Sequence, residues 1–336
     1  MTMLPVVVWN ELEKLIRRRG LLIVLVTAAV IGFGLVIDLA TPQQADWKSQ
    51  TRQQIAQLEA DKVQAQHAPA GLPAGIEASL GSAIDQQIAS EQYLVDHDVP
   101  PLDWYPAGRA VAIILKTGFA FLLLLFGWLA AESVAQERSE HTLALLLSRP
   151  VSRRTLLFGK AAALQIVATT VLLVAMVPVY LVTGLQHAGR ASLTTSVMVL
   201  DDPVKGVLAG NIELLPTWFY VVAAVALSLA AVLVTQALGL LMSILSRGPA
   251  LAIGLTLGTL FVLQPMASVV KLALRDPSWL HYTFLPYLSP SNELTSDPTV
   301  GLGYSSAGLS LTVLLVWAIL LLVAAVTLFA RRNESS

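Results

Sequence analysis

Apolar residues recur along this chain in six long runs, separated by segments that carry most of the polar and charged positions. Each run holds about 20 residues, and an α-helix of that length spans about 30 Å, the thickness of the apolar core of a lipid bilayer. We therefore predict an all-α integral membrane protein with six transmembrane helices, at residues 20–40, 110–131, 161–184, 217–244, 249–271 and 307–329.

Residues 1–19 form a short segment of their own before the first span. Their apolar positions follow roughly helical spacing, and Trp9 and three arginines accompany them. Aromatic and basic residues gather where a membrane meets water, so this pattern predicts an interfacial helix lying on the membrane. A plain positively charged anchor for the first span fits the same residues.

Residues 41–109 predict a helical hairpin outside the membrane. Apolar residues recur every four positions after a turn rich in proline and glycine. The hairpin is too small for an independent core, so it should pack on itself, on its twin or on the outer ends of the spans. The outer loop 185–216 predicts no element, whereas the aromatic residues of the outer loop 272–306 are typical of an interfacial belt or a short re-entrant helix.

Composition and charge support this class and set its orientation. The chain is 55% hydrophobic and 13% charged, which is too apolar for an ordinary soluble enzyme. With both termini inside, including the tail 330–336, the cytoplasmic segments hold twelve basic residues against six acidic ones, and the outer segments hold eight against sixteen. Because basic residues favour the cytoplasmic side, we predict a multi-pass protein of the cell membrane with both termini in the cytoplasm.

The segment 132–160, between the second and third spans, organises the rest of the chain. It combines Leu145, Leu146 and neighbouring leucines with several charged residues. A solvent loop does not need so many leucines, and a spanning helix cannot carry so many charges. The pattern is typical of a helix at the membrane surface that presents a docking face. The alternative is a helix that only rests on lipid headgroups.

Four polar residues interrupt the predicted spans and are candidates for a transport pathway: Lys116, Gln165, Gln236 and Gln264. Charges inside a membrane are often functional, but Lys116 lies only two turns from the outer end of its span and can extend to the headgroups. Glutamines in spans more often join helices than bind cargo.

The fifth span carries a ladder of small residues, Ala250, Gly254 and Gly258. Small residues four apart allow two helices to approach closely. The partner helix can belong to the same chain or to a second copy, and such ladders also occur by chance in apolar helices.

The sequence contains none of the familiar patterns for catalysis. It lacks a Gly-rich phosphate loop, so the chain should not hydrolyse ATP by itself. It also lacks a His-Glu-x-x-His zinc motif, a Gly-x-Ser-x-Gly elbow and any cysteine. Asp96-His97-Asp98 could contact a metal, but one solvated tripeptide is a weak site. We expect no metal, no cofactor and no nucleic acid on this chain.

A detailed motif runs through the segment 132–160. Glu132 is followed by Thr142-Leu143, a run of leucines, Pro150-Val151-Ser152-Arg153 and finally Gly159-Lys160. This motif resembles the first cytoplasmic loop of ABC-2 type permeases, the membrane subunits of ATP-binding-cassette exporters. The amphipathic start, the six spans and the cytoplasmic ends agree with that family's layout. His141 departs from the pattern, because the family often has glycine there.

The resemblance implies that two permease subunits, identical or homologous, pair in the membrane. Each would seat its loop, as a coupling segment, in a groove on a cytosolic dimer of ATPase subunits that binds ATP and Mg. The first and fifth spans lie nearest the pairing axis in this family, which implies a dimer interface at Gly254 and Gly258. The residues implied to contact the ATPase subunit are Glu132, Glu137, Arg138, Glu140, His141, Thr142, Leu145, Leu146, Arg149 and Pro150.

We therefore expect a permease subunit of an ABC exporter, surrounded by membrane lipids. Because the predicted spans hold few charges, an amphiphilic or hydrophobic cargo is favoured over small ions. Two alternatives belong to other classes. An ion-driven secondary transporter would need discontinuous helices and charged residues near the membrane midplane, and a membrane-embedded enzyme or assembly scaffold would act without an ATPase partner.

Overall fold

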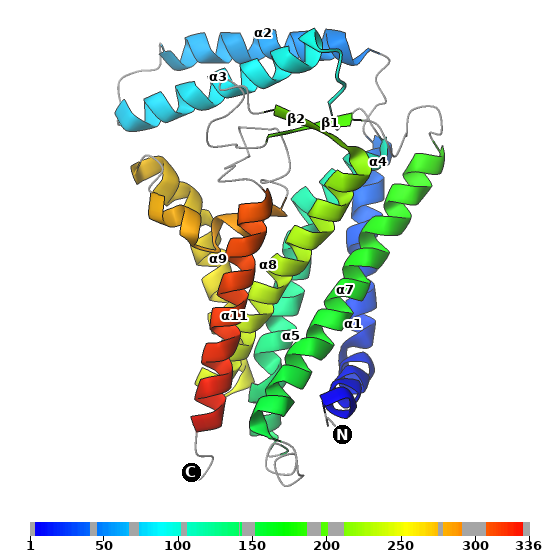
Figure 1. Cartoon of the computed structure of the whole chain (residues 1–336), viewed down its shortest axis with the longest axis vertical. Coiled ribbons are helices and arrows are strands. Elements are labelled where there is room, and N and C mark those ends of the chain that lie inside the picture. Colours follow the sequence, from blue (N-terminus) through cyan, green and yellow to red (C-terminus); the bar gives the residue numbers. More distant parts are fainter. Residues whose placement is uncertain are drawn as a thin grey trace.

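The structure, a computed structural model, describes residues 4–40, 46–66, 74–101, 106–140, 142, 152–186, 196–200, 212–274, 278–290 and 307–331. Long helices stand side by side in a bundle, and two further helices lie across one end (Figure 1). Both ends of the described chain lie at the opposite end, which we call the inner end. This arrangement is expected of a chain that crosses the bundle an even number of times.

The bundle helices are α1 (Leu4–Ala40), α5 (Phe119–Ser139), α7 (Arg153–Gln186), α8 (Thr217–Leu245), α9 (Pro249–Leu274) and α11 (Ala307–Arg331). A π-helical turn, η2 (Ile114–Gly118), joins the short helix α4 (Pro106–Ile113) to α5. The remaining elements belong to the outer end: α2 (Trp47–Gln66), α3 (Ala74–Asp96), β1 (Ser196–Leu200), β2 (Ile212–Pro216), η4 (Ser278–Tyr282) and η5 (Pro286–Leu288).

Four bundle helices are long and apolar enough to cross a membrane: Phe119–Ser139, Arg153–Leu181, Trp218–Leu245 and Gly308–Arg331. They correspond to the second, third, fourth and sixth predicted spans, so the prediction of a multi-span helical protein is confirmed. The predicted spans 20–40 and 249–271 are also helical, in α1 and α9. That these two cross the membrane stays a prediction.

Helix α1 is continuous from Leu4 to Ala40 and so covers both the predicted interfacial segment and the first predicted span. Its first turns, in dark blue, are seen nearly end-on in Figure 1, whereas the rest of the helix runs up the bundle. Val6, Trp9 and Ile16 are exposed on these first turns. Exposed apolar and aromatic side chains at the inner end suit a helix whose outer face meets lipid.

Helices α2 and α3 pack side by side across the outer end of the bundle (Figure 1). Lys62 of α2 pairs with Asp85 of α3, and Trp47 is buried against Leu94 and Val99. This is the two-helix arrangement expected over 41–109. The turn expected between the helices falls mostly in 67–73, outside the described residues.

The expectation of an all-α protein needs one correction at the outer end. Strands β1 and β2 pair antiparallel, with Ser196 opposite Pro216 and Leu200 opposite Ile212. Both lie in the outer loop 185–216, for which the sequence predicted no element. Valine, isoleucine and leucine dominate the two strands, and two short runs of such residues can pair when a loop lets them meet. The body of the protein is nevertheless helical.

The turns η4 and η5 fold the outer loop back against the bundle. Leu280, Tyr287 and Leu288 are buried, while Tyr282 is exposed. The Tyr287 hydroxyl donates to the carbonyl of His281 at 2.9 Å, and the Trp317 indole N–H of α11 donates to the carbonyl of Tyr282 at 2.8 Å. Phe284 and the Tyr282 carbonyl thus join this loop to Trp317 of α11, while the rings of Trp279 and Tyr282 remain exposed.

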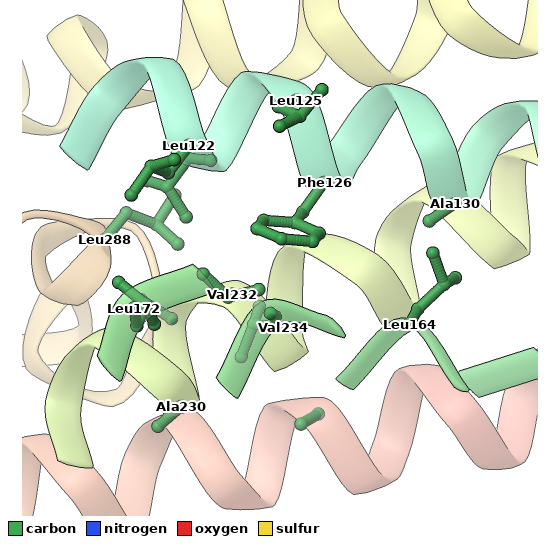
Figure 2. Close-up of a cluster of buried hydrophobic side chains, with 14 of the residues drawn as sticks. Leu122, Leu125, Phe126, Ala130, Leu164, Leu172, Ala230, Val232, Val234 and Leu288 are labelled. Carbon is green, nitrogen blue, oxygen red and sulfur yellow. The ribbon is translucent and has the colours of Figure 1, made fainter. Parts of the chain in front are cut away.

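The hydrophobic core lies between α5, α7 and α8. Figure 2 shows Phe126 of α5 in the middle of this cluster, with Leu122 and Leu288 directed toward each other at one side. The apolar stretches of α5 and α8 are each 67% buried within the subunit, whereas that of α11 is 28% buried. Helix α8 is therefore a central element, and α11 is peripheral.

Small residues bring α5 and α8 close together. A Cβ atom added to Gly239 of α8 would lie 2.8 Å from the Gly127 carbonyl oxygen, 2.8 Å from the Ala130 Cβ and 3.0 Å from the Ala131 nitrogen. Two of these atoms belong to the backbone of α5 and cannot turn aside. Inside a membrane the hydrophobic effect does not drive helices together, because lipid tails are as apolar as the side chains. Close packing through small residues is therefore a main source of helix association there.

Gly239→Val should force α5 and α8 apart and destabilise the protein. Overpacking at a backbone contact costs about 1–3 kcal/mol, which should appear as a lower unfolding temperature of the detergent-purified protein. Gly32→Val is the matched control, because a Cβ at Gly32 of α1 would meet no atom within 4 Å in the part of the chain that the structure describes. Equal unfolding temperatures for the two variants would contradict this account of the core.

Candidate functional site

Four charged side chains meet at the inner end and form an ion cluster: Glu11 and Lys14 of α1, Glu137 of α5 and Lys160 of α7. The Lys160 Nζ donates to Glu11 Oε2 at 2.8 Å and to Glu137 Oε1 at 2.7 Å. The Lys14 Nζ donates to Glu11 Oε1 at 2.9 Å and to Glu137 Oε1 at 3.0 Å. Each ammonium group therefore bridges the same two carboxylates, and the four charges cancel.

Three of the four members of the ion cluster are buried, and the fourth, Lys14, is partly exposed. Lys160 is 3% exposed, Glu11 7% and Glu137 8%. Taking an ion out of water costs several kcal/mol, so buried charges persist only when they are paired. The pairing here is nearly complete, although Glu137 Oε2 has no hydrogen-bond partner among the described residues. Separating α1, α5 and α7 at this point would leave buried charges uncompensated.

The pairing also keeps the two α1 groups charged. Burial raises the pKa of Glu11, but Lys160 and Lys14 outweigh burial, and the pKa lies below its ordinary value. Burial lowers the pKa of Lys14, but Glu137 and Glu11 outweigh it, and the pKa lies above its ordinary value. Glu11 is therefore ionised and Lys14 protonated at neutral pH.

Arg19 of α1 makes a second link to α5. Its guanidinium group forks the carboxylate of Glu132, with Nε 3.2 Å from Oε2 and Nη2 bonded to Oε1. The guanidinium carbon also lies 5.6 Å from the centre of the Trp128 ring, within range of a cation–π contact. A forked arginine–carboxylate pair fixes orientation as well as distance.

Arg18 of α1 makes a third link, to Glu140 just after α5. The two terminal guanidinium nitrogens lie 3.3–3.4 Å from the Glu140 carboxylate, and Gln136 Nε2 donates to the same group at 2.7 Å. The hydrogen bond from Gln136, followed by that from Arg18, lowers the pKa of Glu140. This link is exposed, so it adds direction more than stability.

The inner end of α5 is also joined to α8. Ser243 Oγ accepts hydrogen bonds from the backbone N–H groups of Val134 at 3.1 Å and Ala135 at 2.8 Å. Arg138 Nη1 donates to the carbonyl of Ser246 at 2.9 Å. Through these contacts the last turns of α5 are fixed to the start of the connection between α8 and α9.

The first turn of α7, which follows residues 141–151, is also fixed in place. Ser152 Oγ accepts from the backbone N–H of Thr155 at 3.1 Å and so caps the helix. Arg153 Nη1 lies 3.4 Å from the carbonyl of Phe329 at the end of α11. Both flanks of residues 141–151 are thus attached to neighbouring helices.

The expected ATPase-contact residues that the structure describes fall into an inward-facing group and an exposed group. Glu132, Glu137 and Arg138 direct their charges into the protein, while Glu140 is exposed. Thr142 Oγ1 donates to the carbonyl of Glu137 at 3.2 Å, which draws the beginning of the segment back onto α5. The remaining residues of the set lie outside the described residues: His141, Leu145, Leu146, Arg149 and Pro150.

A family model described as an ABC-2 family transporter protein matches residues 6–333 of this chain. The chain belongs to the ABC-2 transporter family. No curated protein matches it. The family expected from residues 132–160 is confirmed, and the match covers nearly the whole chain rather than one loop. In ABC-2 transporters the membrane subunit associates with ABC ATPase subunits, on which nucleotides bind.

The pathway candidates of this ABC-2 subunit occupy different environments. Lys116 lies in the π-helical turn η2 and is exposed on the subunit surface, where its side chain can extend to headgroups. Gln165 Nε2 donates to the carbonyl of Leu229 at 3.3 Å and so joins α7 to α8. Gln236 is 1% exposed, and its amide has no hydrogen-bond partner among the described residues. The Gln264 side chain is outside the described set.

Helix α9 keeps its two glycines on an open face. A Cβ atom added to Gly254 or Gly258 would meet no atom of the described residues within 4 Å. Leu251, Leu255 and Phe261, at helical spacing around them, are exposed as well. The opposite face of α9, by contrast, is buried against the bundle. Within the described part of the subunit, the glycine ladder therefore does not serve helix packing.

Sequence reasoning missed the part that α1 plays in the site. It assigned Glu132, Glu137 and Glu140 to a partner protein, whereas bases of α1 pair with all three. A signal was present, because bases at 14, 18 and 19 and acids at 132, 137 and 140 both follow helical spacing. One sequence could not show that these two helices are neighbours.

Lys160→Met should strongly destabilise the protein, because Glu11 and Glu137 would remain buried with only Lys14 to neutralise them. Breaking a buried ion pair on one side costs about 3–5 kcal/mol, measurable as a lower unfolding temperature in detergent. Arg17→Met is the control, since the exposed Arg17–Glu13 pair of α1 should contribute at most about 1 kcal/mol. Similar losses in the two variants would contradict a buried cluster.

Proposed function

We propose that this chain is the permease subunit of an ABC exporter that moves an amphiphilic or hydrophobic substrate, using ATP hydrolysed on separate subunits. The observation that carries the proposal is the ion cluster. It ties α5 and α7, the helices that flank residues 141–151, to each other and to α1. A segment held firmly on both flanks can transmit a push to the spans instead of bending. The few charges among the spans favour an apolar cargo.

The proposed topology has six crossings, with α1 and α9 as the first and fifth. Both described ends of the chain lie at one end of the bundle, which supports an even number of crossings (Figure 1). The excess of basic residues on the segments at that end supports a cytoplasmic location for them. Helices α2 and α3 then lie outside the cell membrane.

The proposed contact with the ATPase dimer is the coupling segment. Leu145 and Leu146 would enter an apolar groove on the partner, in the helix-in-groove mode of recognition. Glu140, His141, Thr142, Arg149 and Pro150 would line the edge of this contact. Glu132, Glu137 and Arg138 would act from behind, by holding the helices that carry the segment. ATP and Mg would bind to the partner alone.

Replacing Leu145 and Leu146 together by aspartate should abolish the association with the ATPase. Two unpaired carboxylates in an apolar groove cost several kcal/mol, and each 1.4 kcal/mol lowers affinity about tenfold. The measurement is the amount of ATPase that co-purifies with the tagged permease. Val63→Asp, at an exposed apolar position of α2, is the control and should leave the amount unchanged. Undiminished association of the double variant would count against the contact.

The proposed permease partner is a second subunit, identical or homologous, that meets the open face of α9. Gly254 and Gly258 lie in the middle of this face with room for a closely packed helix. Exposed leucine and phenylalanine side chains border them. Small residues framed by large ones form the usual contact of paired membrane helices.

Gly254→Leu combined with Gly258→Leu should convert the permease dimer into monomers. The new side chains point into open space within the subunit, so the unfolding temperature of the monomer should hardly change, while a partner helix would be kept away. Light scattering on the purified protein in detergent gives the mass. Gly308→Leu, on an equally open position of α11, should stay dimeric. A dimer in both variants would rule out this face.

A further inference from the structure

Gly159 and Lys160 are adjacent residues of α7 that both meet the first turns of α1. A Cβ atom added to Gly159 would lie 2.5 Å from Val7 Cγ1 and 3.2 Å from Val7 Cβ. Real Cβ atoms do not approach so closely, and the β-branched side chain of Val7 has few alternative rotamers. The absence of a side chain at Gly159 is therefore what allows α1 to touch α7 here.

Lys160 extends the same contact by one helical turn. On α1, Glu11 follows Val7 by four residues, so the two lie on one face of the helix. Lys160 bonds to Glu11 at 2.8 Å and reaches Glu137 of α5 at 2.7 Å. The close approach at Gly159 and the ion pair at Lys160 thus join the same two helices one turn apart.

The opposite side of these first turns is largely exposed. Val6 and Trp9 are uncovered, and so is Arg17. The first turns of α1 thus rest on the bundle through one face, whose neighbours are the helices that flank residues 141–151. A helix held in this way either stays attached when the flanking helices move or separates from them at the Gly159 contact.

We propose that Gly159 and Lys160 are positioning residues that keep the first turns of α1 attached to α7 throughout the ATP-driven cycle, so that α1, α5 and α7 move as one body. The inference rests on the proposed function for the existence of that cycle. It adds α1 to the parts that receive the motion of the ATPase. The charges of the ion cluster favour this outcome, because moving α1 away would break two of the four ion pairs, Lys160–Glu11 and Lys14–Glu137. Lys160 and Glu137 would then keep only each other as partners.

A reversible cross-link tests the proposal directly. The chain has no cysteine, so Val7→Cys with Gly159→Cys introduces the only thiol pair. The two Cβ atoms would lie about 3.2 Å apart, just below the 3.5–4.5 Å typical of disulfides. A shift of a few tenths of an ångström brings them into that range, and we expect oxidation to form the bond. The full-length permease, in complex with its ATPase in liposomes, should then hydrolyse Mg-ATP within about twofold of the reduced rate. Failure to cross-link, or loss of hydrolysis that a reductant restores, would overturn the proposal.

A size-complementation pair separates positioning from mere stability. Gly159→Ala should leave the ATPase bound but lower permease-stimulated ATP hydrolysis about tenfold or more, because the new methyl group moves α1 away. Val7→Ala in the same chain removes the opposing methyl groups and should restore hydrolysis. A normal rate in Gly159→Ala, or no rescue by Val7→Ala, would contradict the assignment. A loss confined to the unfolding temperature would indicate a structural role only and would also overturn it.

The proposed function can fail without this inference and is judged separately. If the wild-type permease retained no ATPase, that result would refute the ATP-driven mechanism. Disulfide formation between positions 7 and 159, and the recovery of thermal stability in the paired alanine variant, would still report whether α1 is attached to α7 through Gly159.

Discussion

An ammonium group buried between two carboxylates constrains this molecule more than any other single contact. Lys160 is nearly inaccessible to water, and its charge is tolerated only because Glu11 and Glu137 remain within hydrogen-bonding distance. Those three residues come from three helices. The electrostatic cost of separating them fixes the inner ends of α1, α5 and α7 to one another. Helix packing alone would fix them less firmly, because apolar helices in a membrane exchange one apolar neighbour for another at small cost.

The rest of the architecture builds on this constraint. At the inner end, Ser243 and Arg138 attach α5 to α8, and Arg153 attaches α7 to α11. Deeper in the bundle, polar contacts give way to small residues, and Gly127 and Gly239 bring α5 and α8 into close contact. Ion pairs and hydrogen bonds thus join the helices at the inner end, and close steric packing joins them in the middle of the bundle. A displacement applied between α5 and α7 would reach several helices at once.

The helical body of the fold could be predicted from the sequence, because each span is a long run of apolar residues that can be recognised without knowing its neighbours. The position of α9's glycines on an open face could not, since the ladder of Gly254 and Gly258 fits either partner equally well. The site was only half predictable. The motif 132–160 identified the family, but Glu137 appeared to be a docking charge, whereas it lies buried against lysines from two other helices. Burial depends on which helices are neighbours, and a single sequence does not contain that information.

Helices α8 and α11 are both strongly apolar, but 67% of the apolar stretch of α8 is buried by the rest of the subunit, against 28% of that of α11. For α11, most positions need only be apolar, since lipid adapts to any side-chain shape. For α8, each side chain must also fit a neighbour of fixed shape. Tolerance to amino-acid replacement should therefore differ among helices that are all strongly apolar. Saturation mutagenesis would locate the centre of the subunit at the positions where alanine cannot be replaced by isoleucine.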